Sequence, residues 1–287
     1  MDAKITKISS ATKEVEISRQ NRTVIIGERI NPTGRKAVLA ALEAGNFDLI
    51  REDAVKQVEA GAAVLDVNAG VPGADEVALL SQLIREVMDV VDVPLCIDTA
   101  NPEALEAALK IYPGKALINS VNGEEKSLAA VLPLAKKYGA AVIGLCISDE
   151  GIPATAAARL EVADKIIERA TSMGIPLEDI VIDPLAMTLG ADHLAGALTL
   201  ETVKLVKEKY GVNITMGSSN VSFGLPDRKY INAAYMAMAI QAGMTCPITN
   251  PLVMEIRTAA LAADFALGRD EYGSRWIKDF RKRKKAA

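Results

Sequence analysis

Short apolar runs of strand length recur along the chain from residue 24 onward, and each is followed by a longer amphipathic segment that fits a helix. Because the runs are apolar throughout rather than alternating, we expect strands that are buried on both faces, as in a parallel sheet. The predicted strands begin at Val24 (VIIGE), Ala63 (AVLDVNA), Pro94 (PLCID), Ala116 (ALINS), Ala141 (AVIGLCI), Ile180 (IVIDP), Val212 (VNITMG) and Met244 (MTCPIT). The pattern therefore predicts eight βα units.

Successive predicted strands start 39, 31, 22, 25, 39, 32 and 32 residues apart, so each interval can hold one right-handed crossover helix. Eight such units are typical of a single (β/α)8 TIM barrel, which is the α/β fold that we predict. An open doubly wound sheet is the alternative, but that fold usually carries a G-x-G-x-x-G turn, which does not occur here. We expect an N-terminal extension over residues 1–22, the barrel over 23–275 and a basic C-terminal tail over 276–287.

Composition narrows the class of protein. The chain has 287 residues and 33 Lys and Arg against 37 Asp and Glu, which gives a formal charge of −4 with the single His neutral. Half of the residues are apolar but only 4% are aromatic, so the core must be aliphatic. The three cysteines form no C-x-x-C pair, and we expect Cys96, Cys146 and Cys246 to be buried small hydrophobes rather than disulfides or zinc ligands.

The chain carries no pattern of membrane targeting. Its N-terminus is polar, and no stretch approaches the ~20 apolar residues of a membrane span. We therefore expect a cytoplasmic protein with neither a membrane nor a nucleic acid as partner. The run RKRKK at 281–285 reads as a solvated tail, with contact to an acidic partner surface as the alternative.

Most predicted strands end in polar residues. In a barrel of this class, chemistry lies at the C-terminal ends of the strands. The candidates, in strand order, are Glu28, Asn31, Asp66, Asn68, Asp98, Asn119, Asp183, Gly217, Ser219 and Asn220. Any one Asp or Asn could simply cap the following helix. Together, carboxylates that accept hydrogen bonds and carboxamides that also donate them suit a neutral heterocycle with an amino group beside a ring N–H.

Seven segments in one order resemble the methyltetrahydrofolate:corrinoid-protein methyltransferases, which are pterin-binding methyltransferases. They are GERIN (27–31), LDVNAG (65–70), CIDTAN (96–101), INSVNGE (118–124), VIGLCISDEGIP (142–153), VIDPL (181–185) and GSSNVSFGLPDR (217–228). The resemblance implies a barrel enzyme that moves a methyl group between the cobalt of a corrinoid protein and N5 of tetrahydrofolate.

The same resemblance implies roles for particular residues. Asp98, Asn119 and Asp183 would hold the pyrimidine edge of the pterin, and Asn220 would contact N5 by hydrogen bonding. The adjoining wall would contain Gly217, Ser219 and Arg228. Glu28, Asn31, Asp66 and Asn68 are candidates of second rank, for the pocket itself or for orienting its neighbours. Arg228 falls in the first turn of a helix expected to begin at Pro226 or Asp227, and an ion pair with Asp227 is its structural alternative.

The corrinoid is expected on a separate partner protein. Corrinoid modules usually carry a D-x-H-x-x-G loop, whereas the only histidine, His193, lies in Asp192-His193-Leu194-Ala195-Gly196, one residue short of that spacing. We therefore predict no metal on this chain. The resemblance also implies a homodimer. Direction is open from the sequence, with tetrahydrofolate favoured as acceptor, as in demethylase systems that form 5-methyltetrahydrofolate.

Two alternatives share the pterin subsite. A dihydropteroate synthase would carry an N-x-T-P-D-S-F type first motif and a lysine after the seventh strand, where this chain has GERIN and Gly-Ser-Ser-Asn. A non-catalytic pterin-binding module of a larger assembly is the other alternative, and turnover with a loaded corrinoid protein separates it from an enzyme.

Overall fold

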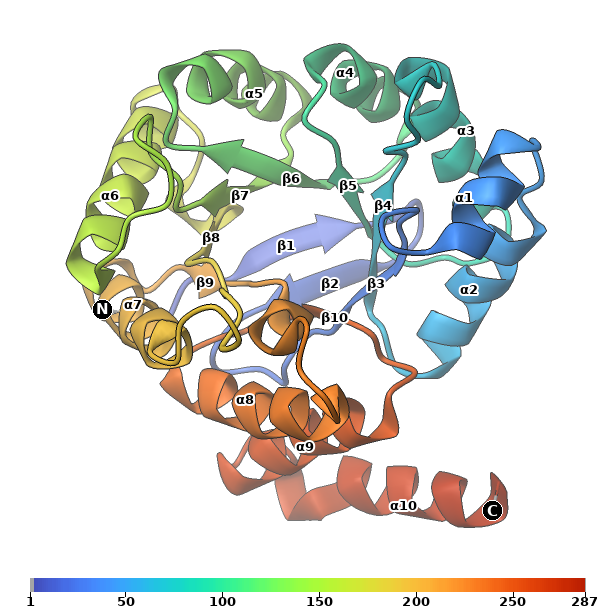
Figure 1. The fold of residues 1–287 in the computed structure, drawn as a ribbon, viewed down its shortest axis with the longest axis vertical. Coiled ribbons are helices and arrows are strands. Elements are labelled where there is room, and N and C mark those ends of the chain that lie inside the picture. The colour runs from blue at the N-terminus through green and yellow to red at the C-terminus, as the bar shows by residue number, and fades with distance from the viewer. Residues whose placement is uncertain (1–2, 287) are drawn as a thin grey trace.

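The computed structural model describes residues 3–286, and its centre is a ring of eight parallel strands surrounded by helices (Figure 1). The strands lie in the order β10-β3-β4-β5-β6-β7-β8-β9. Their bounds are β3 (Ile26–Ile30), β4 (Val64–Asn68), β5 (Leu95–Asp98), β6 (Leu117–Asn122), β7 (Ala141–Leu145), β8 (Ile180–Asp183), β9 (Asn213–Ile214) and β10 (Ile248–Thr249). A parallel bridge between Gly217 and Ile248 joins the first and last strands of this order. The predicted (β/α)8 architecture is confirmed.

The helices alternate with the strands as predicted, with few exceptions. The helices are α1 (Lys36–Glu43), α2 (Asp48–Glu59), α3 (Glu76–Met88), α4 (Pro102–Ile111), α5 (Glu125–Tyr138), α6 (Ala156–Ser172), α7 (Ala195–Tyr210), α8 (Arg228–Ala242), α9 (Met254–Ala266) and α10 (Ser274–Ala286), with short 3-10 turns η1 (Leu177–Asp179), η2 (Ser218–Ser222) and η3 (Glu271–Gly273). The exceptions are α1 and α2, which both lie between β3 and β4, and α10, which lies outside the ring that the other helices form (Figure 1). No helix in residues 3–286 is both long and apolar enough to cross a membrane.

The strands bury both faces, as their apolar runs predict. One face meets the helices, through side chains such as Leu65, Ile97 and Ile182. The other face fills the barrel interior, where Val64, Cys96, Leu117, Ile143 and Val181 belong to one buried cluster. The alternation along each strand therefore divides the core into an outer layer under the helices and an inner layer within the barrel.

The last strand is shorter and later than predicted. The apolar run starts at Met244, but regular pairing begins only at Ile248. Pro247 has no N–H to donate, and the carbonyl of Cys246 accepts a hydrogen bond from the Thr215 hydroxyl at 2.6 Å instead of joining a strand ladder. The segment closes the barrel through these less regular contacts.

Residues 3–22 of the expected extension include a hairpin that the sequence pattern did not predict. Strands β1 (Thr6–Ser9) and β2 (Glu14–Ile17) pair antiparallel and cross the middle of the ring in Figure 1. Ile8 and Ile17 are fully buried in the same cluster as the barrel interior. The Asn213 side chain donates to the Ile17 carbonyl at 2.8 Å and to the Thr6 hydroxyl at 2.8 Å. The hairpin therefore closes the N-terminal end of the barrel.

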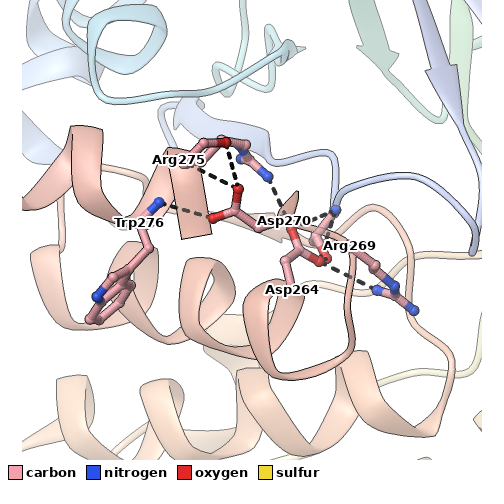
Figure 2. A network of polar contacts seen from close by, with 7 residues as sticks. Asp264, Arg269, Asp270, Arg275 and Trp276 are labelled. Atoms are coloured by element: carbon pink, nitrogen blue, oxygen red, sulfur yellow. Dashed lines mark hydrogen bonds and ion pairs between the residues drawn. The ribbon is translucent and has the colours of Figure 1, made fainter. Parts of the chain in front are cut away.

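The expected C-terminal tail is a helix over its described part, residues 276–286, which continue α10 outside the ring (Figure 1). Residues 1–2 and 287 lie outside the described part of the chain. Asp264 is 1% exposed and ion-pairs with Arg269 and Arg275, both at 3.4 Å, while it accepts from the backbone N–H of Thr23 at 2.9 Å (Figure 2). Asp270 accepts from the N–H of Trp276 at the start of α10. This network fastens α10 to the segment that leads into β3.

The hairpin should contribute to stability through the core rather than through its surface contacts. Ile8 is fully buried and Ile5 is 42% exposed, so the pair offers the same substitution in two environments. We expect Ile8→Ala to lower the free energy of unfolding by about 2–5 kcal/mol and Ile5→Ala by less than about 1 kcal/mol, measured by urea unfolding. Equal losses in the two variants would show that the hairpin is not part of the core.

Candidate functional site

The predicted pterin residues lie one layer above the apolar barrel interior. The inner layer contains Cys96 on β5, Leu117 on β6 and Val181 on β8. Two residues further along the same strands come Asp98, Asn119 and Asp183. Since side chains alternate along a strand, these three face the same side as the residues below them, at the C-terminal end of the barrel. Strand geometry therefore brings the predicted residues to one rim.

Two carboxamides each donate a hydrogen bond to a carboxylate on another strand of the rim. The Asn68 side-chain N–H donates to Asp98 at 3.0 Å, and the Asn119 side-chain N–H donates to Asp66 at 3.0 Å. Strand register sets the first contact, because Asn68 on β4 lies opposite Asp98 on β5. The second contact runs from β6 to β4 across the end of β5. Within residues 3–286, Oδ1 of Asp98 and Oδ1 of Asn119 have no hydrogen bond, which leaves two acceptors for a ligand.

Burial raises the pKa values of the carboxyl groups at this part of the rim. The Asp98 pKa rises to about 6, because desolvation outweighs the hydrogen bond from Asn68. The Asp66 pKa lies well above its ordinary value, through burial first and the negative charge of Asp98 second. A cavity of about 440 Å³ is lined by Asp98, Asn119, Asn122 and Lys126, among others. The cavity can admit a flat heterocycle beside these acceptors.

Asp183 is held by the loop that follows its own strand. Its Oδ1 accepts the N–H of Leu185 at 2.8 Å, and the residue is 7% exposed. Burial raises the Asp183 pKa to about 7, against the opposing effects of that N–H and of the nearby Arg159 guanidinium. Its second carboxylate oxygen has no hydrogen bond within the described residues, so Asp183 can also accept from a ligand.

The corner after β9, formed by η2, contacts β3. The Ser219 hydroxyl donates to Glu28 at 3.0 Å, and burial raises the pKa of Glu28 despite this bond. Arg228 begins α8 and donates to the Ser219 carbonyl at 2.7 Å and to the Ser222 hydroxyl at 3.0 Å. The predicted alternative partner, Asp227, forms no ion pair with Arg228 in the part of the chain that the structure describes. Arg228 thus braces the corner.

Asn220 lies on this corner with its amide uncommitted. The residue is exposed, and its side chain has no hydrogen bond to another described residue. A Cβ at position 217 would come within 2.9 Å of the Asn220 side-chain nitrogen, so only glycine fits there while the amide keeps this position. The structure shows no capping bond from the Asn220 side chain among residues 3–286, and the amide is available to a ligand.

The other residues that the sequence singled out lie elsewhere or have local roles. Oδ1 of Asn31 accepts the N–H of Thr33 at 2.8 Å, which closes a turn after β3. His193 is exposed in the loop before α7, and its ring nitrogen lies 3.9 Å from Asp192. All three cysteines are buried. Across the described range, no group of three or more His, Cys, Asp or Glu side chains is arranged to hold a metal.

Sequence reasoning missed Arg159, which is 3% exposed. It lies on α6 among the buried positions Ala156, Val162, Ala163 and Ile166. The spacing of these positions could have identified it, since an arginine on the apolar stripe of a helix requires internal partners. Asn122 and Lys126, which line the cavity beside Asp98, were not singled out either.

Comparisons with known proteins agree with this geometry. Residues 27–250 match the family described as pterin binding enzyme. The chain is 32% identical over 267 residues to a methylcorrinoid:tetrahydrofolate methyltransferase of Eubacterium limosum, across 91% of this chain and 97% of that protein. It is 29% identical over 286 residues to methionine synthase of Mycobacterium tuberculosis, across 92% of this chain but only 24% of the relative.

Similar solved structures include dihydropteroate synthases. The enzyme of Yersinia pestis with a pterine-sulfa conjugate has a TM-score of 0.70 at 17% identity, covering 92% of this chain and 99% of that one. The enzyme of Xanthomonas albilineans in complex with 7,8-dihydropteroate has a TM-score of 0.68 at 21% identity, covering 91% and 98%. At these identities the likeness shows the shared fold alone.

The raised pKa of Asp183 has a consequence for stability. Between about pH 4 and pH 7 the folded protein keeps a proton on Asp183 that the unfolded chain releases, so this residue lowers the free energy of unfolding as pH rises. We expect Asp183→Asn to remove that dependence, so that its stability relative to the parent increases by up to about 1.4 kcal/mol per pH unit in this window.

Urea unfolding at several pH values measures the difference. Asp149→Asn is the matched control, because the Asp149 carboxylate is exposed and paired with Lys165, and the pKa of that carboxyl is lowered. A constant difference between Asp183→Asn and the parent across the window would contradict the assignment.

Proposed function

Because the chain belongs to the pterin binding enzymes, and among them to the methyltetrahydrofolate:corrinoid-protein methyltransferases, we propose that it transfers a methyl group between a corrinoid protein and N5 of tetrahydrofolate. The observation that carries this proposal is the layer of Asp98, Asn119 and Asp183 above the barrel interior. Each has an acceptor atom without a hydrogen bond in the described part of the chain. The corrinoid is supplied by a separate protein that acts as the second substrate.

The donors and acceptors of this layer suit the pyrimidine edge of a pterin. That edge offers an amino group and a ring N–H as donors, which match the free oxygens of Asp98, Asn119 and Asp183. A carboxylate accepts both donors best when it is ionised, and pKa values of about 6 for Asp98 and about 7 for Asp183 leave that form accessible near neutral pH. A hydrogen-bonded ligand would also offset the cost of burying the charge.

Methyl transfer needs alignment more than acid–base chemistry. The N5 lone pair attacks the methyl carbon in line as the carbon–cobalt bond breaks, its electron pair stays on cobalt, and N5 then loses its proton. Asn220 has an uncommitted amide at the corner and can hydrogen-bond N5 as charge develops there. Because a carboxamide is neither acid nor base in this pH range, its contribution is orientation and hydrogen bonding.

We propose tetrahydrofolate as the methyl acceptor. The relative from Eubacterium limosum that matches nearly end to end has a methylcorrinoid as its named donor and tetrahydrofolate as its named acceptor. The homodimer and the absence of a resident metal stay predictions, for which light scattering and metal analysis of the purified protein are the measurements.

Binding separates this function from that of a dihydropteroate synthase. We expect tetrahydrofolate and 5-methyltetrahydrofolate to bind more tightly than 6-hydroxymethylpterin pyrophosphate, because no lysine stands at the Gly-Ser-Ser-Asn corner to meet a pyrophosphate. Titration of the purified protein with the three ligands measures this order. Tightest binding of the pyrophosphate would overturn the proposal, and binding without transfer from a methylated corrinoid protein would leave a non-catalytic pterin-binding module.

Asn220→Ala should affect transfer more than binding. A hydrogen bond that strengthens with charge on N5 is worth about 1.5–3 kcal/mol, or roughly 10- to 150-fold in rate. With the loss of placement added, we expect the single-turnover rate to fall by roughly 10- to 1000-fold while tetrahydrofolate affinity changes less. Asn46→Ala is the control, because Asn46 is an exposed turn residue whose side chain accepts the N–H of Asp48. A lower melting temperature with an unaltered transfer rate would make Asn220 a structural residue.

A further inference from the structure

Arg159 is a buried cation whose side-chain hydrogen bonds within residues 3–286 all go to neutral oxygens. Its Nη1 donates to the carbonyls of Pro184 at 2.7 Å and Leu185 at 2.8 Å, and its Nε donates to the carbonyl of Pro153 at 3.1 Å. No carboxylate lies within ion-pair distance of it in residues 3–286. Because this guanidinium is 3% exposed and donates its hydrogen bonds to loop carbonyls, it fixes the positions of those loops.

The three carbonyls belong to the two loops around Asp183. Pro153 lies in the loop between β7 and α6, while Pro184 and Leu185 directly follow β8. One planar group with donors in fixed directions therefore ties both loops to α6, the helix that carries it. A lysine has a single nitrogen and cannot reproduce this spread of donors.

The backbone that Arg159 holds is strained. Leu185 has φ of 65°, in the left-handed region that residues other than glycine rarely adopt. Its carbonyl accepts from Arg159 and also from the Thr199 hydroxyl on α7 at 2.9 Å, while its N–H donates to Asp183. Such a conformation persists where surrounding contacts over-determine it, and these contacts do so.

We propose that Arg159 is a positioning residue that holds the Asp183 carboxylate at the pterin edge by fixing the backbone of Pro184 and Leu185. The chain of contacts runs from Arg159 to the Leu185 carbonyl, through the strained Leu185 backbone to its N–H, and from there to Asp183 Oδ1. The role in folate binding rests on the proposed function, whereas the link to Asp183 itself belongs to the free protein.

The charge of Arg159 acts on Asp183 as well. Asp183 and Arg159 interact electrostatically with each other. The other titratable groups that interact with one or both of them are Tyr235 on α8, Cys146 after β7 and Cys246 before β10. Burial raises the pKa of Tyr235 to about 12 and keeps the two cysteine thiols protonated. Among these five residues, therefore, Arg159 is the one that carries a positive charge beside Asp183 at neutral pH. Its removal should favour the protonated carboxyl, which accepts hydrogen bonds less well.

Two substitutions at position 159 separate geometry from charge. Arg159→Met removes both, and Arg159→Lys keeps the charge without the spread of donors. Arg169→Met is the matched control on the same helix, since Arg169 is half-exposed and pairs with Glu125. Thr199→Val removes, at nearly constant volume, the hydroxyl that donates to the Leu185 carbonyl and that also accepts from Arg159 Nη1 at 3.4 Å.

The first readout is the titration of Asp183 in the free protein. Carbon-13 NMR of the side-chain carboxyl monitors this titration, and the Asp183→Asn variant assigns the signal. We expect Arg159→Met to raise the midpoint by at least about one pH unit, with little change in Arg159→Lys and none in Arg169→Met. The second readout is tetrahydrofolate affinity from pH 6 to 9.

At pH 7, one unit of upward shift from about 7 reduces the ionised fraction of Asp183 from about one half to about one tenth, so Arg159→Met should weaken binding roughly five-fold through charge alone. This part of the loss should shrink above pH 8.5. The loss of affinity that comes from the altered geometry should persist at every pH. It should also appear in Arg159→Lys and, more weakly, in Thr199→Val.

The proposal is overturned if Arg159→Met folds and matches the parent in both readouts, whatever its melting temperature. If Arg159→Met does not fold, unchanged affinity in both Arg159→Lys and Thr199→Val overturns it. If the parent protein itself fails to bind tetrahydrofolate, the proposed function fails, and the NMR titration still decides whether Arg159 controls Asp183.

Discussion

The burial of carboxyl groups above an apolar barrel interior is the constraint on which the rest of the site depends. Asp66 lies within β4, and Asp98 and Asp183 end β5 and β8, with apolar residues before them on each strand; burial raises the pKa of all three carboxyl groups. An ionised carboxylate in such a place is costly unless hydrogen bonds or a ligand stabilise it. Much of the polar architecture of the rim answers this cost.

The rim meets that cost with neutral donors rather than with direct ion pairs. Asn68 and Asn119 each donate one amide N–H to a carboxylate, and Leu185 donates its backbone N–H to Asp183. A cation in direct contact would hold each carboxylate ionised but would also occupy the oxygens that a ligand needs. Neutral donors satisfy one oxygen and leave the other free, at the expense of a pKa close to neutrality.

Strand periodicity made most of the barrel and the rim predictable. The alternation of buried runs and helices was enough to place Asp98 and Asp183 at strand ends, and the eight units appear in the expected order. The strand that carries Asn119 is longer than predicted, because β6 continues to Asn122. The hairpin was not predictable in the same way, because β1 (TKIS) and β2 (EVEI) are four residues each and contain only three apolar side chains between them. Their burial depends on a barrel floor that exists only after folding. The place of Arg159 on the apolar stripe of α6 marks it as buried, but its partners could not be predicted, because loop carbonyls leave no mark in a sequence.

The hairpin has a consequence for how the protein is made. Thr6 and Asn213, which hydrogen-bond beneath the barrel, are 207 residues apart in the chain. During synthesis the hairpin emerges before the barrel strands, but its binding surface is complete only when the later strands have left the ribosome. For most of translation, Ile8 and Ile17 therefore have no complete core to pack against, and we expect their docking to be among the last steps of folding. A substitution in the hairpin would thus act on the completion of the core, even though the hairpin lies at the opposite end of the barrel from Asp98 and Asp183.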